Sequence, residues 1–133
     1  MLLARAVVIH GLADARAALR PGRPVTLLSG VGAASYAGCG WWRALIARAL
    51  AESGHAAADV LDCADAPGRA VEALRAGCRH LVLDGGVPAF ADVAGRAATL
   101  GAVVLPSRPA ALDLAGRGAA RRLDAWLAGE GAS

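Results

Sequence analysis

The sequence contains no lysine, and this absence excludes several chemistries. All 14 Lys or Arg positions of the 133-residue chain are arginine. A Walker A nucleotide site requires a lysine that reaches the phosphates. Schiff-base catalysis and a lysine-anchored pyridoxal phosphate require the lysine amine. The sequence therefore excludes a P-loop nucleotide site, a pyridoxal phosphate site and lysine-dependent covalent catalysis.

Cysteine is also scarce, and the spacing of the cysteines matches no metal-binding motif. The three cysteines, Cys39, Cys63 and Cys78, include no C-x-x-C pair. An odd number at these spacings argues against a disulfide framework and against a structural zinc site. We therefore expect a reducing, cytoplasmic location and no metal motif.

Runs of like charge and long apolar helices are absent as well. The net charge is +3, but the arginines alternate with acids and have no aromatic residues interleaved, so we expect no nucleic-acid partner. The N-terminus lacks the pattern of a secretory signal peptide. The uncharged stretch between Arg23 and Arg43 contains proline and several glycines, so we expect no membrane-spanning helix.

What the chain does contain is a recurring unit of apolar run, small-residue loop and alanine-rich helical segment. The apolar runs are AVVI (6–9), VTLL (25–28), DVLD (59–62), LVLD (81–84) and AVVL (102–105). Such short, non-alternating runs are typical of strands buried on both faces of a parallel sheet. Through this alternation alone the chain resembles flavodoxin-like and Rossmann-like domains. We predict one α/β domain over residues 1–133, with three layers and a mainly parallel five-stranded sheet.

A half-barrel of four or five βα units that pairs with a second chain is the alternative fold. A complete (βα)8 barrel needs about 250 residues, so a chain of this length would supply only part of one. Both folds have the same functional consequence, because ligands bind at the carboxyl ends of parallel strands.

The stretch SGVGAASYAGCGWW (29–42) follows the second apolar run and reads as a glycine-rich loop of about eleven residues before a helix that starts near Trp41. It is not a dinucleotide fingerprint, because Ser35 stands where G-x-G-x-x-G needs its third glycine. The backbone around Ser29, Gly30, Gly32 and Ser35 could still hold an anion, and Arg108, between two prolines, could pair with it. We therefore predict binding of an anionic or phosphorylated small molecule, with a flexible turn as the alternative interpretation.

Four side chains near the strand ends are candidates for catalysis, and the sequence leaves open whether the protein is an enzyme. Cys63 could act as nucleophile with His10 as base and Asp62 or Asp84 orienting it. The carboxylates, together with Asp65, could instead hold Mg²⁺. The structural alternatives are a buried cysteine, a helix cap at Asp65 and a turn at Asp84.

Aromatic residues make up only 4% of the chain, yet three of them lie close together at Tyr36, Trp41 and Trp42. Aromatic side chains are enriched both at protein interfaces and in ligand sites. The alternative function is therefore a non-catalytic scaffold or homo-oligomerisation domain that uses this region.

Overall fold

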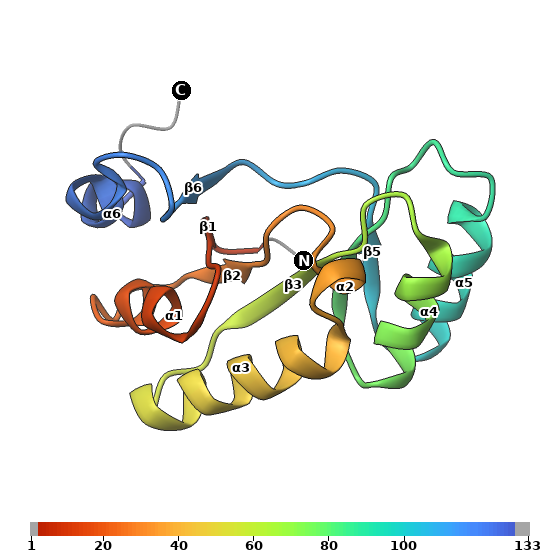
Figure 1. Ribbon diagram of the computed structural model, residues 1–133, viewed down its shortest axis with the longest axis horizontal. Coiled ribbons are helices and arrows are strands. Elements are labelled where there is room, and N and C mark those ends of the chain that lie inside the picture. The colour runs from red at the N-terminus through yellow and green to blue at the C-terminus, as the bar shows by residue number, and fades with distance from the viewer. Residues whose placement is uncertain (1–2, 130–133) are drawn as a thin grey trace.

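The computed structural model describes residues 3–129 and contains one six-stranded parallel sheet that alternates with helices (Figure 1). The strands are β1 (Ala6–Val8), β2 (Thr26–Leu28), β3 (Ala58–Asp62), β4 (His80–Val82), β5 (Val103–Leu105) and β6 (Ala111–Asp113). The helices are α1 (Leu12–Leu19), α2 (Ala33–Tyr36), α3 (Cys39–Ser53), α4 (Pro67–Arg75), α5 (Phe90–Thr99) and α6 (Ala119–Leu127). The predicted α/β class is confirmed, and the architecture is consistent with a flavodoxin-like or Rossmann-like domain.

The strand order is β5-β4-β3-β2-β1-β6, and every pair is parallel. The first five strands add side by side in chain order. β6 then returns to the free side of β1, so the direction of strand addition reverses there. The sheet stays open with β5 and β6 as its edges, which favours the open α/β class over the half-barrel alternative.

β6 is one strand more than the sequence predicted. It has only three residues, and only its central Leu112 is fully buried, so it forms no apolar run. Its Leu112–Asp113 pair nevertheless matches the Leu–Asp pairs at 61–62 and 83–84, which follow or end buried strands. This repeat of the Leu–Asp pair is the feature of the sequence that could have indicated β6.

The helices pack on one face of the sheet, over a continuous apolar core. This core joins strand residues such as Val7, Leu27 and Leu81 to small and branched side chains from all six described helices. The opposite face carries a smaller cluster around Leu28 and Val60. The residues packed against that second cluster are Leu3, which precedes β1, Leu105 of β5 and Ala111 of β6, so among the described residues no helix contributes to it.

The connector between β5 and β6 (106–110) contains no helix and runs across the sheet from one edge to the other (Figure 1). The reversal of strand order forces this path, since β6 pairs with β1 at the far side from β5. The connector therefore passes the carboxyl ends of the intervening strands, where sequence reasoning had placed the site.

Left-handed glycines follow three of the helices. Gly54 closes α3 with φ +71°, and Gly77 and Gly101 follow α4 and α5 with φ +98° and +71°. Glycine adopts this conformation without the steric cost that other residues meet.

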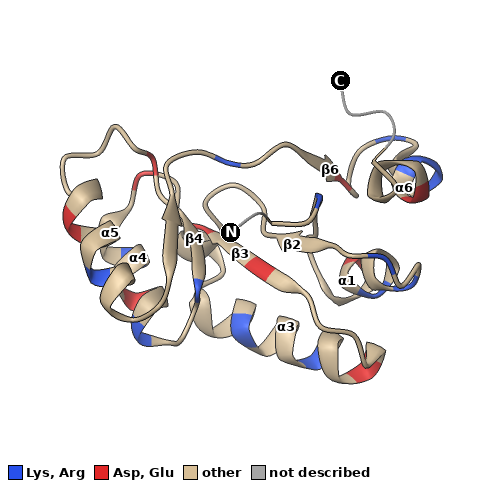
Figure 2. Ribbon diagram, turned by 180° about the vertical axis from the view of Figure 1, so that it is seen from behind, with Lys and Arg blue, Asp and Glu red and all other residues tan. Residues whose placement is uncertain are grey.

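Helices α1 and α3 are tied together by Glu52. Arg16 donates two hydrogen bonds to its carboxylate, at 2.7 and 2.9 Å, and Arg48 donates a third at 3.0 Å. The hydrogen bonds from Arg16 and then Arg48 lower the pKa of Glu52 to about 2, despite opposing desolvation. Charged residues of both signs are interspersed along the helices (Figure 2).

The longest helix, α3, has 15 residues. Within residues 3–129 no helix is both long enough and apolar enough to cross a bilayer.

Candidate functional site at the carboxyl edge

Arg108, at the middle of the connector, contacts two strand ends at once. Its Nη1 donates to Oδ2 of Asp62 at 2.7 Å and to the carbonyl oxygen of Ser29 at 3.1 Å. The connector crosses above β2 and β3 at this point. Sequence reasoning placed all three residues at this edge but did not predict that the arginine pairs with Asp62.

Asp62 is the centre of a buried hydrogen-bond network. Its side chain is 2% exposed, and its Oδ1 accepts the backbone N–H groups of Gly32 at 3.1 Å and Ala64 at 2.6 Å. Its own N–H donates to Oγ of Ser29 at 2.9 Å, and that hydroxyl donates to the carbonyl of Gly30 at 2.9 Å. Asp62 therefore joins the loop after β2, the loop after β3 and the connector, and all of its oxygens are engaged in holding them.

The glycine-rich stretch differs from the prediction in two ways. It is not one long open loop, because α2 occupies 33–36 and α3 begins at Cys39, two residues before the predicted start. The N–H of Gly32, predicted to hold an anion, donates instead to Asp62. Ser35 lies exposed on α2. The protein's own carboxylate thus takes the place predicted for an anionic ligand at this glycine.

A cavity of about 240 Å³ opens beside Arg108. Its lining residues are Val31, Asp62, Ala64, Val82, Asp84, Pro106, Ser107 and Arg108. The side chain of Arg108 is 26% exposed, and both of its hydrogen bonds within residues 3–129 come from Nη1. The N–H groups on Nε and Nη2 have no partner in that part of the chain.

Asp84 lines the same cavity, but its side chain stabilises a turn. Its Oδ1 accepts the N–H of Gly86 at 2.9 Å, as expected where an aspartate precedes two glycines. Gly85 packs so closely on the connector that a Cβ there would lie 2.9 Å from Cβ of Pro106. The tight contact fixes the position at which the connector leaves β5.

The carboxylates that the sequence offered as an option for Mg²⁺ do not come together in one cluster. Within the described part of the chain, no three His, Cys, Asp or Glu side chains gather as a metal site would require. Asp65 also makes no cap, because α4 has no side-chain hydrogen bond at its N-terminus. The carboxylates of the edge are separated by their different hydrogen-bond partners.

Cys63 lacks the surroundings of a nucleophile. It is fully buried, and desolvation, followed by the negative charge of Asp62, raises the pKa of its thiol to about 12. The thiolate form is therefore negligible at neutral pH. Cys63 follows β3 as part of the helix-facing core, which is the structural alternative that the sequence left open.

His10 pairs with Asp113, a partner that the sequence reasoning missed along with β6. The distance from Nε2 to Oδ1 is 2.7 Å, and both side chains are partly exposed. The backbone N–H of His10 donates to Asp14 at 2.9 Å, which fixes the chain at the entry to α1. Burial alone would raise the pKa of Asp113. The hydrogen bonds from the N–H of Ala115 and from His10, together with the charges of His10 and Arg108, outweigh burial and lower this pKa.

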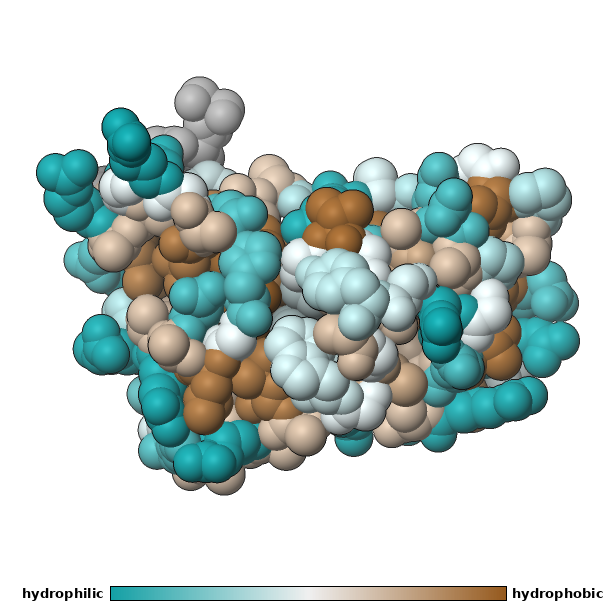
Figure 3. All heavy atoms as spheres, viewed as in Figure 1, coloured by the Kyte–Doolittle hydropathy of each residue, from teal (hydrophilic) through white to brown (hydrophobic). Residues whose placement is uncertain are grey.

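The three clustered aromatic residues do not share one environment. Trp42 is fully buried, and its Nε1 donates to Asp59 at 2.9 Å. Tyr36 and Trp41 remain 68% and 37% exposed, as does nearby Val31 at 65%. On the face drawn in Figure 3, strongly hydrophilic side chains gather toward the two ends and less polar ones lie between them. Of the three residues predicted for a contact surface, Tyr36 and Trp41 are exposed and Trp42 is not.

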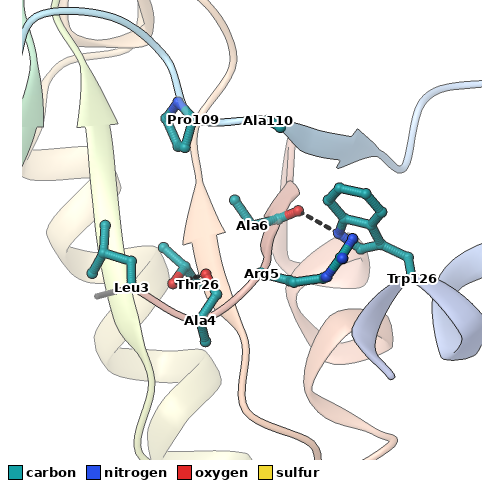
Figure 4. A pocket seen from close by; sticks show the side chains of 8 residues that line it. All are labelled: Leu3, Ala4, Arg5, Ala6, Thr26, Pro109, Ala110 and Trp126. Atoms are coloured by element: carbon teal, nitrogen blue, oxygen red, sulfur yellow. Dashed lines mark hydrogen bonds between the residues drawn. The ribbon is translucent and has the colours of Figure 1, made fainter. Parts of the chain in front are cut away.

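A second cavity, of about 340 Å³, lies where β1 begins and carries no acid–base group (Figure 4). It is lined by Leu3, Ala4, Arg5, Ala6, Thr26, Pro109, Ala110 and Trp126. The guanidinium of Arg5 stacks 4.3 Å from the centre of the Trp126 ring, whose Nε1 donates to the carbonyl of Ala6 at 2.8 Å. The charged group that lines it among residues 3–129, Arg5, is thus already engaged, so the carboxyl edge remains the better candidate for chemistry.

No protein-family model matches this chain, and no curated protein is significantly similar to it.

Proposed function

We propose that the carboxyl edge of the sheet binds a small anionic molecule, a phosphate or a carboxylate, and that Arg108 makes the principal contact. The observation that carries this proposal is a fixed guanidinium in the wall of a cavity. Two bonds from Nη1 hold the group, and its remaining N–H groups are free to donate.

Preorganisation favours arginine in this role. The segment 106–109 begins and ends with proline, which restricts the backbone on both sides of Arg108. A planar guanidinium presents parallel N–H donors that match two oxygens of a carboxylate or phosphate. Because Asp62 already balances the charge of Arg108, recognition would depend on this geometry more than on net charge.

The cavity limits the size of the ligand. Its volume of about 240 Å³ lies below the roughly 300–1,000 Å³ of pockets that enclose drug-sized molecules. A phosphate, a small dicarboxylate or the phosphate end of a larger molecule is therefore the appropriate class.

The test compares wild-type protein with Arg108→Lys in titrations with inorganic phosphate and succinate. Lysine keeps the charge beside Asp62 but has no planar pair of donors. The wild-type protein should gain about 1.4 kcal/mol of stability at ten times the dissociation constant, measured as a thermal shift, and Arg108→Lys should lose this gain. Arg96→Lys, at an exposed arginine on α5, is the matched control. Equal shifts in all three proteins, or none in any, would contradict the proposal.

Homo-oligomerisation is a second candidate, favoured by the exposure of Tyr36 and Trp41. Sedimentation of the wild type and of a Tyr36→Ser/Trp41→Ser variant tests it. A dimer that the double variant loses supports the interface, and a monomer at all concentrations excludes it.

A further inference from the structure

His10 and Asp113 meet where the strand order reverses. His10 follows β1 and Asp113 ends β6, so the two neighbouring strands bring together residues 103 positions apart in the chain. In open α/β sheets the point of reversal is where ligands bind, at the carboxyl ends of the strands. The pair therefore occupies the favoured position of this topology, yet anion binding at Arg108 makes no use of it.

The hydrogen bond to Asp113 determines which imidazole nitrogen is free. An ionised carboxylate only accepts hydrogen bonds, so Nε2 of His10 carries the hydrogen in the 2.7 Å contact. In the neutral imidazole this leaves the lone pair on Nδ1. Nδ1 has no hydrogen-bond partner within residues 3–129.

A tyrosine hydroxyl lies beside this free nitrogen because Gly30 has no side chain. A Cβ on Gly30 would be 2.5 Å from Oη of Tyr36 and 3.4 Å from Nδ1 of His10. Both polar atoms thus occupy the space above the same glycine. The hydroxyl is a hydrogen-bond donor, so a proton acceptor and a donor face one small region at the edge.

We propose that His10 and Asp113 form a general acid–base site in which Nδ1 of His10 accepts the proton, for hydrolysis of a small ester that carries an anionic group. Asp113 is a positioning residue that holds the ring and its tautomer. Tyr36 donates to the oxygen on which negative charge develops. This proposal rests on the proposed function in one respect only, namely that Arg108 would hold the anionic group of the ester.

The reaction balances without any further reactant. Nδ1 takes a proton from water while the water oxygen bonds to the ester carbonyl carbon. The carbon–oxygen bond to the alcohol then breaks, and the departing alkoxide takes the proton back from His10. A phenolic donor beside the carbonyl oxygen stabilises the intermediate that forms between these steps.

Arg108 contacts the residue next to Gly30, because it donates to the carbonyl of Ser29 at 3.1 Å. Its positive charge is also among the influences that lower the pKa of Asp113. The proposal places the anionic group of the ester at Arg108 and the ester carbonyl above Gly30.

The first experiment measures hydrolysis of p-nitrophenyl acetate, a neutral ester, by the whole protein. His10→Gln should lower the protein-catalysed rate about a hundredfold, the low end for general-base catalysis, because His10 is partly exposed. His55→Gln, at an exposed histidine away from this edge, should keep the rate. Equal rates for wild type and His10→Gln would overturn the proposal.

The second experiment reads the tautomer of His10 by ¹⁵N NMR together with the ester rate, and a purely structural role for Asp113 would leave the ester rate unchanged. The ligand-free wild type should carry its hydrogen on Nε2, and Asp113→Asn should lose this preference and most of the ester rate. Asp124→Asn, at an exposed carboxylate on α6, is the control and should change neither. A hydrogen on Nδ1 in the wild type refutes the assigned role.

The two proposals fail separately. His10→Gln should keep the phosphate-induced thermal shift of the wild type, because the proposed anion contact is Arg108 and not His10. A wild-type protein whose ester hydrolysis depends on His10 but which shows no phosphate shift would overturn only the anion site. A phosphate shift that Arg108→Lys loses, without any His10-dependent hydrolysis, would overturn only the acid–base pair.

Discussion

Replacing Arg108 by alanine removes the charged partner of a buried carboxylate, and the cost can be worked from the geometry. Removing one member of a buried ion pair costs about 3–5 kcal/mol when the remaining charge is left without partners. Asp62 keeps two backbone N–H donors on Oδ1 and borders a cavity that admits water, so the loss is close to that of one charge-assisted hydrogen bond. We expect a destabilisation of about 2 kcal/mol.

Urea unfolding followed by tryptophan fluorescence measures this loss. A change of about 2 kcal/mol shifts the midpoint by about 1 M urea in a domain of this size. Arg96→Ala, which breaks an exposed i,i+4 pair with Asp92, is the control and should cost less than about 0.5 kcal/mol.

A double-mutant cycle separates the ion pair from the rest of the network. Asp62→Asn and Arg108→Ala share one interaction, so their combined cost should fall short of the sum by about 1–2 kcal/mol. Additive costs, or an Arg108→Ala variant as stable as the control, would refute the view that this pair joins the connector to the strand ends.

Three other predictions concern the rest of the chain. The low pKa of Glu52 stabilises the folded wild type above the unfolded pKa of 4.5, and this stability is lost as the pH falls toward the folded pKa of about 2. Glu52→Gln should lack this stability, so the acid unfolding curves of the wild type and the variant should converge at low pH. Gly85→Ala should cost about 1–3 kcal/mol in thermal unfolding, because the added methyl meets the rigid ring of Pro106, and an unchanged melting temperature would contradict the close packing. A thiol reagent at neutral pH should label the half-buried Cys39 first, whereas Cys63, buried and with a pKa near 12, should react only as the fold opens.

The fold could be predicted because its strands are continuous apolar runs and its helices end in glycine. Burial on both faces selects branched and leucine side chains whatever the details of packing, and this pattern is visible in a single sequence. β6 was not predicted because an edge strand of three residues buries few side chains and therefore needs no apolar run in the sequence. The sequence therefore indicated five of the six strands but not their order, and the missing strand is the one that pairs with β1 where the strand order reverses.

The site could be predicted only as a list of residues at one edge. His10, Ser29, Asp62 and Asp84 follow or end strands and had to lie there in any parallel sheet. Which of them touch depends on the path of the connector from β5 to β6, and that path follows from the strand order. No local pattern in the sequence encodes it.

The three aspartates that follow a leucine at the strand ends illustrate this dependence. Asp62 is buried against Arg108, Asp84 closes a turn, and Asp113 holds His10, although each ends the same Leu–Asp pair. Asp62 lies in the middle of the sheet, where the connector passes overhead and brings the guanidinium of Arg108 to its buried carboxylate. Asp113 lies on the edge strand beyond the connector's path, and its Oδ1 pairs with the imidazole of His10 while it accepts the N–H of Ala115. The same Leu–Asp pair thus has different contacts at each strand end, according to its distance from the connector. The strand ends at β1 and β6, where the strand order reverses, are therefore the first place to look for acid–base chemistry.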